Sequence, residues 1–229
     1  ILSLSLIYVI CFRVLIKTRG MTDMAIPNIE EYDLSSLETT ISNKVDWRIS
    51  PSRGLLLVHD MQNFFLNPLP GLLRNTLLEN CAQLINWARE NSIPVVYTGQ
   101  KGSMNAKERG LLYDFWGAGM QADPIQTAIT PLLAPQLGEP VLKKWRYSAF
   151  FSSELADIFT AQMRDQIIIC GVYAQIGILT TALDAYSRDI EVFLVQDAIA
   201  DFSQDAHQRM LAYAASCCAS ILSVEEVLA

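Results

Sequence analysis

The chain has 229 residues, of which 51% are apolar and 18% are charged, and its formal net charge is −7. This composition can fill a substantial core, so it excludes a disordered chain and suits one α/β domain of generous size. The acidic balance argues against a nucleic-acid partner, because nucleic-acid phosphates bind to basic patches. It leaves room for a small anionic substrate, whose carboxylates a few buried arginine and lysine side chains can hold.

The first twenty residues differ from the rest of the chain. Residues 1–12 are an apolar run followed by basic side chains, too short for a membrane span of about 20 residues and without the basic leader of a secretory signal. Met21 begins a more ordinary, polar stretch. We therefore predict that 1–20 is an upstream or non-native extension, that 21–52 is an extended N-terminal arm, and that 53–229 is the functional domain. A membrane anchor is the alternative for the extension, and the mass of the natively expressed protein would distinguish the two.

From Arg53 onward, short apolar runs alternate with stretches that carry apolar residues at helical spacing. The runs predict strands at 55–58, 94–98, 140–142, 167–170, 192–195 and 219–224. The intervening stretches predict helices at 73–90, 153–163, 176–188 and 203–218. Alternating strands and helices indicate crossover connections, which make neighbouring strands parallel. The predicted fold class is α/β, a Rossmann-like three-layer α/β/α sandwich with a six-stranded, mostly parallel sheet.

The residues that follow the predicted strands are the first candidates for a functional site. In an open parallel sheet, ligands bind beyond the carboxyl ends of the strands. The residues at those ends are His59-Asp60, Gly99-Gln100, Lys143-Lys144 and Gly171-Val172-Tyr173. Topology alone therefore selects a set with one carboxylate, an adjacent pair of lysines, an amide and a phenol.

Asp60 is the candidate acid, because it directly follows four apolar residues and burial raises the pKa of a carboxyl group. A helix cap or a loop-tethering aspartate is the structural alternative. Lys144, at another strand end, would oppose burial by favouring the ionised carboxylate, and the residues alone leave open which effect prevails. Arg109 lies in a Lys-Glu-Arg run that also fits a solvated helix face.

Other catalytic chemistries lack their motifs in this chain. There is no G-x-S-x-G elbow, no dinucleotide-binding fingerprint and no Walker-type phosphate loop. With two histidines and no zinc-type spacing among the cysteines, of which Cys217 and Cys218 are adjacent, the sequence predicts no metal site. The five cysteines are odd in number and irregularly spaced, which indicates thiols packed in a core and a reducing, cytoplasmic location.

Six blocks occur along the predicted domain: LVHDMQ at 57–62, YTGQ at 97–100, DFWGAGM at 114–120, KWRYSAF at 144–150, GVYA at 171–174 and DAIADFS at 197–203. Together, and in this order, they resemble the isochorismatase family. The resemblance implies an isochorismatase-type α/β/α fold. Cysteine amidohydrolases of the wider superfamily would carry their nucleophile just after Gly177, where this chain has Ile178. The resemblance therefore points to the vinyl-ether hydrolases of the family.

The resemblance implies acid catalysis on a chorismate-derived ring, without a cofactor or a metal. Asp60 and Lys144 would be the catalytic residues, and protonated Asp60 would deliver its proton to the methylene carbon of the enolpyruvyl group. The residues expected to bind the substrate or wall its pocket are Phe64, Gln100, Arg109, Trp116, Tyr173 and Gly177. A non-proline cis peptide bond before Tyr173 and a homodimer are further implications. Gln175 departs from the histidine that relatives usually have, which puts fine tuning in doubt more than activity.

Three short segments bear on which substrate the resemblance favours. Those at 67–70, 102–104 and 148–151 look more like the branch that hydrolyses 2-amino-2-deoxyisochorismate in phenazine biosynthesis. The chain also ends at Ala229, so we expect none of the carrier domain often fused to siderophore enzymes. The alternative is hydrolysis of isochorismate for siderophore synthesis, because nothing visible separates an amino from a hydroxyl group at ring carbon 2. Less favoured are a cysteine-independent amidohydrolase and a non-catalytic binding protein that keeps the pocket.

Overall fold

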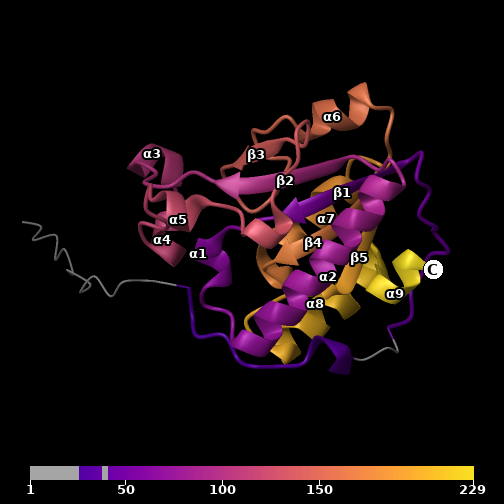
Figure 1. The fold of residues 1–229 in the computed structure, drawn as a ribbon, viewed down its shortest axis with the longest axis horizontal. Helices are drawn as coiled ribbons and strands as arrows, with labels where there is room; N and C mark the ends of the chain where they lie inside the picture. The colour runs from indigo at the N-terminus through magenta and orange to yellow at the C-terminus, as the bar shows by residue number, and fades with distance from the viewer. Residues whose placement is uncertain (1–25, 38–40) are drawn as a thin grey trace, which may run out of the picture.

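Six parallel strands form the centre of the molecule. The computed structural model describes residues 26–37 and 41–229, so the predicted extension at 1–20 lies outside the described residues (Figure 1). The strands lie in the order β3-β2-β1-β4-β5-β6, and every neighbouring pair is parallel. Their bounds are β1 Gly54–His59, β2 Val95–Gln100, β3 Val141–Lys144, β4 Gln166–Val172, β5 Glu191–Ala200 and β6 Ser220–Leu222. The predicted α/β class is confirmed, with a sheet that is parallel throughout rather than mostly parallel.

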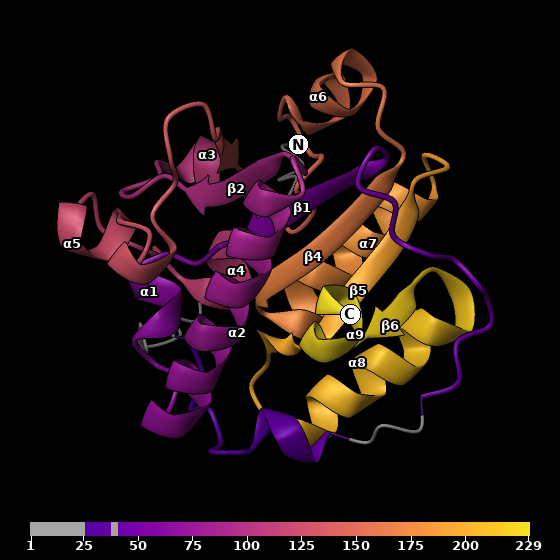
Figure 2. The ribbon, with the colours of Figure 1, turned by 45° about the vertical axis from the view of Figure 1, so that its right-hand side comes forward.

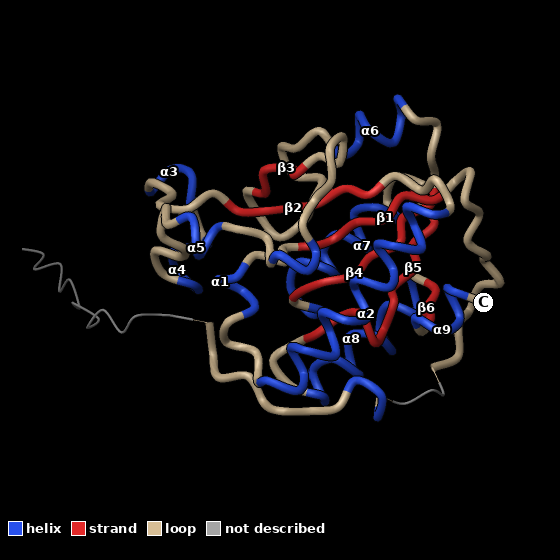
Figure 3. Tube along the Cα trace, in the orientation of Figure 1, coloured by secondary structure: helices blue, strands red, loops and turns tan. Residues whose placement is uncertain are grey.

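Helices cover both faces of this sheet, which is therefore the middle of three layers (Figure 3). The long helix α2 packs on one face together with α9, and α6, α7 and α8 pack on the other. The bounds are α2 Gly71–Glu90, α6 Leu155–Ala161, α7 Leu179–Tyr186, α8 Gln204–Cys217 and α9 Val224–Leu228. Along β1, Leu56 and Val58 face α2, whereas Leu55 and Leu57 face the opposite layer. This period-two alternation lets one continuous apolar run serve two cores.

Four short helices gather at the carboxyl ends of β1 and β2 (Figure 1). They are α1 Asn63–Leu66, α3 Ala106–Arg109, α4 Leu112–Trp116 and α5 Pro124–Thr127. The sequence predicted none of them, because one turn of helix is too short to show a hydrophobic period. Two 3₁₀ turns, at Leu34–Ser36 and Pro131–Leu133, were missed for the same reason.

The N-terminal arm wraps the lower edge of the sheet, passing α8 and the β6 side before it enters β1 (Figure 2). It is mostly extended where it is described, but Ile29, Tyr32, Leu34 and Leu37 are buried in the core against α2 and β5. Further along, Asn43 forms two hydrogen bonds with the backbone of Ile221 in β6, at 2.8 and 2.9 Å. The arm therefore contributes to the core. The domain boundaries themselves stay a prediction. Within the described part of the chain, no helix is long and apolar enough to cross a membrane.

Candidate active site

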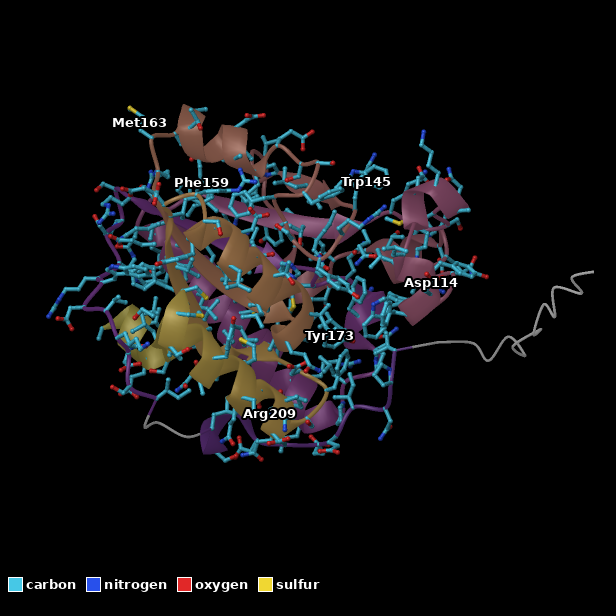
Figure 4. All side chains as sticks on the ribbon, turned by 180° about the vertical axis from the view of Figure 1, so that it is seen from behind. Asp114, Trp145, Phe159, Met163, Tyr173 and Arg209 are labelled. Carbon is cyan, nitrogen blue, oxygen red and sulfur yellow. The ribbon has the colours of Figure 1, made fainter. Side chains whose placement is uncertain are left out.

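A cavity of about 680 Å³ opens where the first four strands end. Figure 4 shows Tyr173 and Asp114, which both line this cavity, on the same side of the molecule and away from Met163, which precedes β4. Every residue predicted for the site lines it: Asp60, Phe64, Gln100, Arg109, Trp116, Lys144, Tyr173 and Gly177. Other residues to which the sequence assigned no role also line the cavity, among them His59, Phe65, Tyr147 and Phe202. The structure thus gathers the predicted set in one place, while the role of each residue stays a prediction.

Asp60 stands directly after β1, in a left-handed backbone conformation with φ +52°. Aspartate and asparagine tolerate this conformation better than other non-glycine residues. The side chain is 5% exposed, and both carboxylate oxygens are bonded. Lys144 Nζ donates to Oδ2 at 2.7 Å, and Thr98 Oγ1 donates to Oδ1 at 2.6 Å. Three strand ends therefore converge on one buried carboxylate.

Lys144 decides the ionisation of this carboxylate in the free site. Burial would raise the pKa of Asp60, but the Lys144 ammonium, the neighbouring His59 and the hydrogen bond from Thr98 together hold the pKa below its ordinary value. The sequence left open which effect prevails, and the structure answers in favour of the ionised carboxylate. The predicted protonated acid is therefore not the resting form of the empty site.

His59 is fully buried and forms the floor of the cavity beside Asp60. Its Nδ1 lies 2.8 Å from the Val172 carbonyl oxygen, which sets Nδ1–H as the donor. Nε2 has no hydrogen-bond partner among the described residues. Burial lowers the pKa of His59 to about 4, so the ring is neutral at neutral pH. The strand-end position was visible in the sequence, but which neighbours the ring meets was not.

Gly177 lacks a side chain because the His59 ring fills that space. A Cβ at this position would lie 2.3 Å from Cε1 of the ring and 3.3 Å from Lys144 Nζ. Both distances are below ordinary van der Waals contact. The glycine therefore allows the segment after β4 to approach the buried ion pair closely.

Replacing Gly177 with alanine is expected to destabilise the protein by about 1–3 kcal/mol, because the new methyl group overpacks the site against His59. Denaturant unfolding of the variant measures this change. Alanine at Gly71 is the matched control, because a Cβ there meets nothing within 4 Å. Equal stability of the Gly177 variant and the wild type would contradict the packing described here.

Arg109 does not lie on a solvated helix face, which was the structural alternative for its Lys-Glu-Arg run. It ends α3, but it is 6% exposed and lines the cavity. Its guanidinium donates to the backbone oxygens of Gly117 and Trp116 at 2.9 and 3.4 Å, and to Gln100 Oε1 at 3.4 Å. It forms no ion pair with a carboxylate of the described residues. A buried guanidinium without a counter-charge is suited to bind an anion that enters the cavity.

Aromatic side chains form the walls. The ring of Tyr173 lies 4.6 Å from the ring of Phe202, and Trp116 Nε1 donates to Tyr147 Oη at 2.8 Å. The peptide bond between Val172 and Tyr173 is cis, as the resemblance implied. The Tyr173 hydroxyl donates to the carbonyl of Phe65 in α1. Its proton is therefore already in use, and donation to a substrate carboxylate would require exchanging that hydrogen bond.

No thiol lines this cavity among the described residues. Ile178, at the position of the amidohydrolase nucleophile, is a fully buried core residue. Cys81, Cys170 and Cys218 are buried free thiols elsewhere, and Cys217 is exposed. The described chain also contains no group of three histidine, cysteine or carboxylate side chains placed to hold a metal ion. The cavity therefore combines a buried carboxylate, Asp60, with two buried cations, Lys144 and Arg109.

Comparisons with known proteins show the family of this chain. The family model described as the isochorismatase domain matches residues 54–226. A phenazine biosynthesis protein, PhzD, of Pseudomonas fluorescens is 51% identical over 89% of this chain and 98% of its own length. The isochorismatase of Bacillus subtilis is 44% identical over 90% of this chain and 66% of its own. Among solved structures, a cysteine hydrolase from Pseudomonas syringae superposes with a TM-score of 0.73 at 25% identity, covering 80% of this chain and 94% of that one.

The parallel sheet, with the Asp60–Lys144 pair at its carboxyl edge, defines the class: an α/β hydrolase whose pocket is lined by no cysteine among the described residues. The family match extends over nearly the whole described domain, and so do the relatives. The chain belongs to the isochorismatase family.

Proposed function

We propose that this protein hydrolyses the enolpyruvyl ether of 2-amino-2-deoxyisochorismate to pyruvate and trans-2,3-dihydro-3-hydroxyanthranilate, with Asp60 as the general acid. The buried Lys144–Asp60 pair in a cavity that also holds an unpaired Arg109 is the observation that carries this function. Lys144 donates to Asp60 and Arg109 lines the same cavity, so the pocket offers two cations to a substrate with two carboxylates. Two relatives named as phenazine biosynthesis proteins, at 51% and 49% identity, favour the amino substrate.

The reaction begins with transfer of a proton from Asp60 to the methylene carbon of the enol ether. The carbon–hydrogen bond forms as the vinyl π bond breaks, which leaves an oxocarbenium ion. Water then adds to this ion and loses a proton to the Asp60 carboxylate, which restores the acid. The hemiketal collapses to pyruvate and the ring alcohol, with its hydroxyl proton passing to the ring oxygen as the carbon–oxygen bond breaks. Carbon protonation is slow in water, so a positioned acid in a closed site supplies what the step needs. Arg109, Gln100 and Lys144 orient the carboxylates, and Trp116 with Phe64 excludes water.

The acid must acquire its proton when the substrate binds, because the free site holds Asp60 ionised. A substrate carboxylate placed against Lys144 draws on the same ammonium that stabilises the Asp60 anion. It also adds negative charge beside Asp60. Both changes raise the pKa of Asp60, so binding of the substrate is coupled to protonation of the Asp60 carboxylate.

The pH dependence of turnover follows from this requirement. The reactive form is protonated Asp60, and its pKa in the free enzyme lies below the ordinary value. We therefore expect kcat/KM to fall by up to about tenfold per pH unit over the whole measured range, because that range lies above the pKa of Asp60 in the free enzyme. The decline of kcat should begin at a higher pH, because kcat reports the complex in which the pKa is raised. Steady-state rates between pH 5 and 9 measure both, and a kcat/KM that rises with pH would contradict an acid mechanism.

Pyruvate release from the purified protein tests the function itself. The protein is supplied with 2-amino-2-deoxyisochorismate or with isochorismate, in the presence of a chelator. Faster turnover of the amino compound is the expected result. Pyruvate from neither compound would reject the vinyl-ether reaction and favour a binding protein.

Hydrolysis of isochorismate to 2,3-dihydro-2,3-dihydroxybenzoate and pyruvate is the second candidate. It is favoured by the 44% identity to the Bacillus subtilis isochorismatase and the 41% identity to enterobactin synthase component B of Escherichia coli. The mechanism is unchanged, because the ether and both carboxylates are the same. Faster turnover of isochorismate in the experiment above would select this candidate.

We further propose that the protein works in the cytoplasm as a homodimer. The buried free thiols support a reducing compartment. Leu111 and Phe115, exposed at 77% and 67%, offer apolar area for a second copy. Analytical ultracentrifugation at micromolar concentration tests the dimer, and a monomer mass at all concentrations would exclude it.

A further inference from the structure

Asp201 is a buried carboxylate that the proposed chemistry does not use. It directly follows β5 and is completely buried. Its Oδ2 accepts the backbone N–H of Gln175 at 2.9 Å, and its Oδ1 accepts the N–H of Phe202 at 3.0 Å. It forms no ion pair with a cationic side chain in the described ranges 26–37 and 41–229. Two backbone N–H groups are thus the hydrogen-bond partners of the Asp201 carboxylate.

Such a residue is costly to keep, because burying a carboxylate without a counter-ion disfavours its charged form. Burial raises the pKa of Asp201 to about 6, although both amide hydrogen bonds oppose that rise. The carboxylate accepts two backbone N–H groups at once, which a neutral amide side chain in the same place cannot do. The role of the carboxylate therefore depends on the two backbone segments that carry these N–H groups.

Both amides belong to the wall of the cavity. Gln175 lies in the π-helical turn Ala174–Ile178, between Tyr173 and Gly177, which line the cavity. The Phe202 ring packs against the Tyr173 ring at 4.6 Å. Asp201 therefore joins the end of β5 to the segment after β4 that faces the substrate.

The N-terminal arm supports Asp201 from the opposite side. The N–H of Asp201 donates to Tyr32 Oη at 2.8 Å, and that oxygen lies 3.1 Å from His207 Nδ1. Burial lowers the pKa of His207 to about 3, so its ring is neutral, and the ring shares one hydrogen bond with the Tyr32 hydroxyl. On the same arm, the backbone N–H of Glu30 donates to the carbonyl oxygen of Phe202 at 3.0 Å. A continuous set of hydrogen bonds thus runs from the arm to the cavity.

We propose that Asp201 is a positioning residue of the active site, which holds the Tyr173–Gly177 segment in its substrate-binding position, and that Tyr32 of the N-terminal arm holds Asp201 in turn. The proposal rests on hydrogen bonds that join Asp201 to Gln175 and to Tyr32, and Asp201 is not itself among the residues that line the cavity. The kinetic meaning of this proposal rests on the proposed function, because the segment matters for turnover only if the cavity is where substrate binds.

The kinetic experiment compares Asp201→Asn and Tyr32→Phe with Asn43→Ala. The asparagine variant keeps the shape but turns an N–H group toward one of the two amides. Asn43 tethers the same arm to β6, away from the cavity, so its removal is the control for loss of stability. We expect kcat/KM of Asp201→Asn to fall by about tenfold to a hundredfold, with most of the change in KM, and a smaller change for Tyr32→Phe. Asn43→Ala should lower Tm and leave kcat and KM within about twofold.

Hydrogen exchange at the Gln175 amide gives a second readout that needs no substrate. This N–H should exchange slowly in the wild type and at least about tenfold faster in Asp201→Asn, but not in Asn43→Ala. Unchanged KM and unchanged exchange in Asp201→Asn, with only Tm lowered, would overturn the proposal. If the wild type releases no pyruvate but the Gln175 amide responds as expected, the proposed function fails while the positioning of the segment stands.

Discussion

Replacing Asp60 with asparagine should lower kcat for pyruvate release by about a thousandfold. The amide has no proton acidic enough for carbon, and no other carboxyl group in the described chain shares the hydrogen bonds to Lys144 and Thr98. Asparagine tolerates the left-handed backbone at this position, so the strand end keeps its shape. Stopped-assay pyruvate measurements with saturating substrate give the change in kcat.

Two controls separate this loss from a loss of folding. The far-ultraviolet spectrum of Asp60→Asn should match that of the wild type. Asp205→Asn, which removes an exposed carboxylate on α8, should leave kcat within about twofold. Retention of more than a tenth of the wild-type kcat by the Asp60 variant would mean that another group is the acid.

Replacing Lys144 with methionine should lower kcat/KM and, separately, raise the pKa of Asp60. Loss of the buried ammonium removes the charge partner of a substrate carboxylate and should lower kcat/KM by about a hundredfold. At the same time the pKa of Asp60 rises, because burial then acts without the opposing cation. The decline of kcat/KM with pH should therefore move to higher pH, although the rate at every pH is lower.

The profile of rate against pH checks both effects in one experiment. Lys143→Met is the matched control, because this neighbouring lysine on β3 is exposed and lies over the Trp145 ring. It should leave the rate and the profile unchanged. A Lys144 variant whose profile moves to lower pH would show that the ammonium does not govern the ionisation of Asp60.

The sequence by itself determined the order of strands and helices and the edge of the sheet that carries the site. Apolar runs such as Leu55–Val58 are local signals, and parallel topology then brings all strand ends to one side. Asp60 and Tyr173 directly follow strands, and Gln100 and Lys144 end them, so all four could be found without coordinates. Arg109, Trp116, Phe64 and Gly177 were available only through the resemblance to a family, because they lie on short helices or turns that show no period.

Only the tertiary structure decided what those residues do to one another. Asp60 and Lys144 are 84 positions apart, and their 2.7 Å contact sets the ionisation that burial alone would have reversed. The neutral His59 beneath Gly177 and the Asp201 carboxylate behind Gln175 are equally invisible to local patterns. The physical reason is that strand and helix formation depends on neighbours in sequence, whereas pKa values and cavity shape depend on neighbours in space.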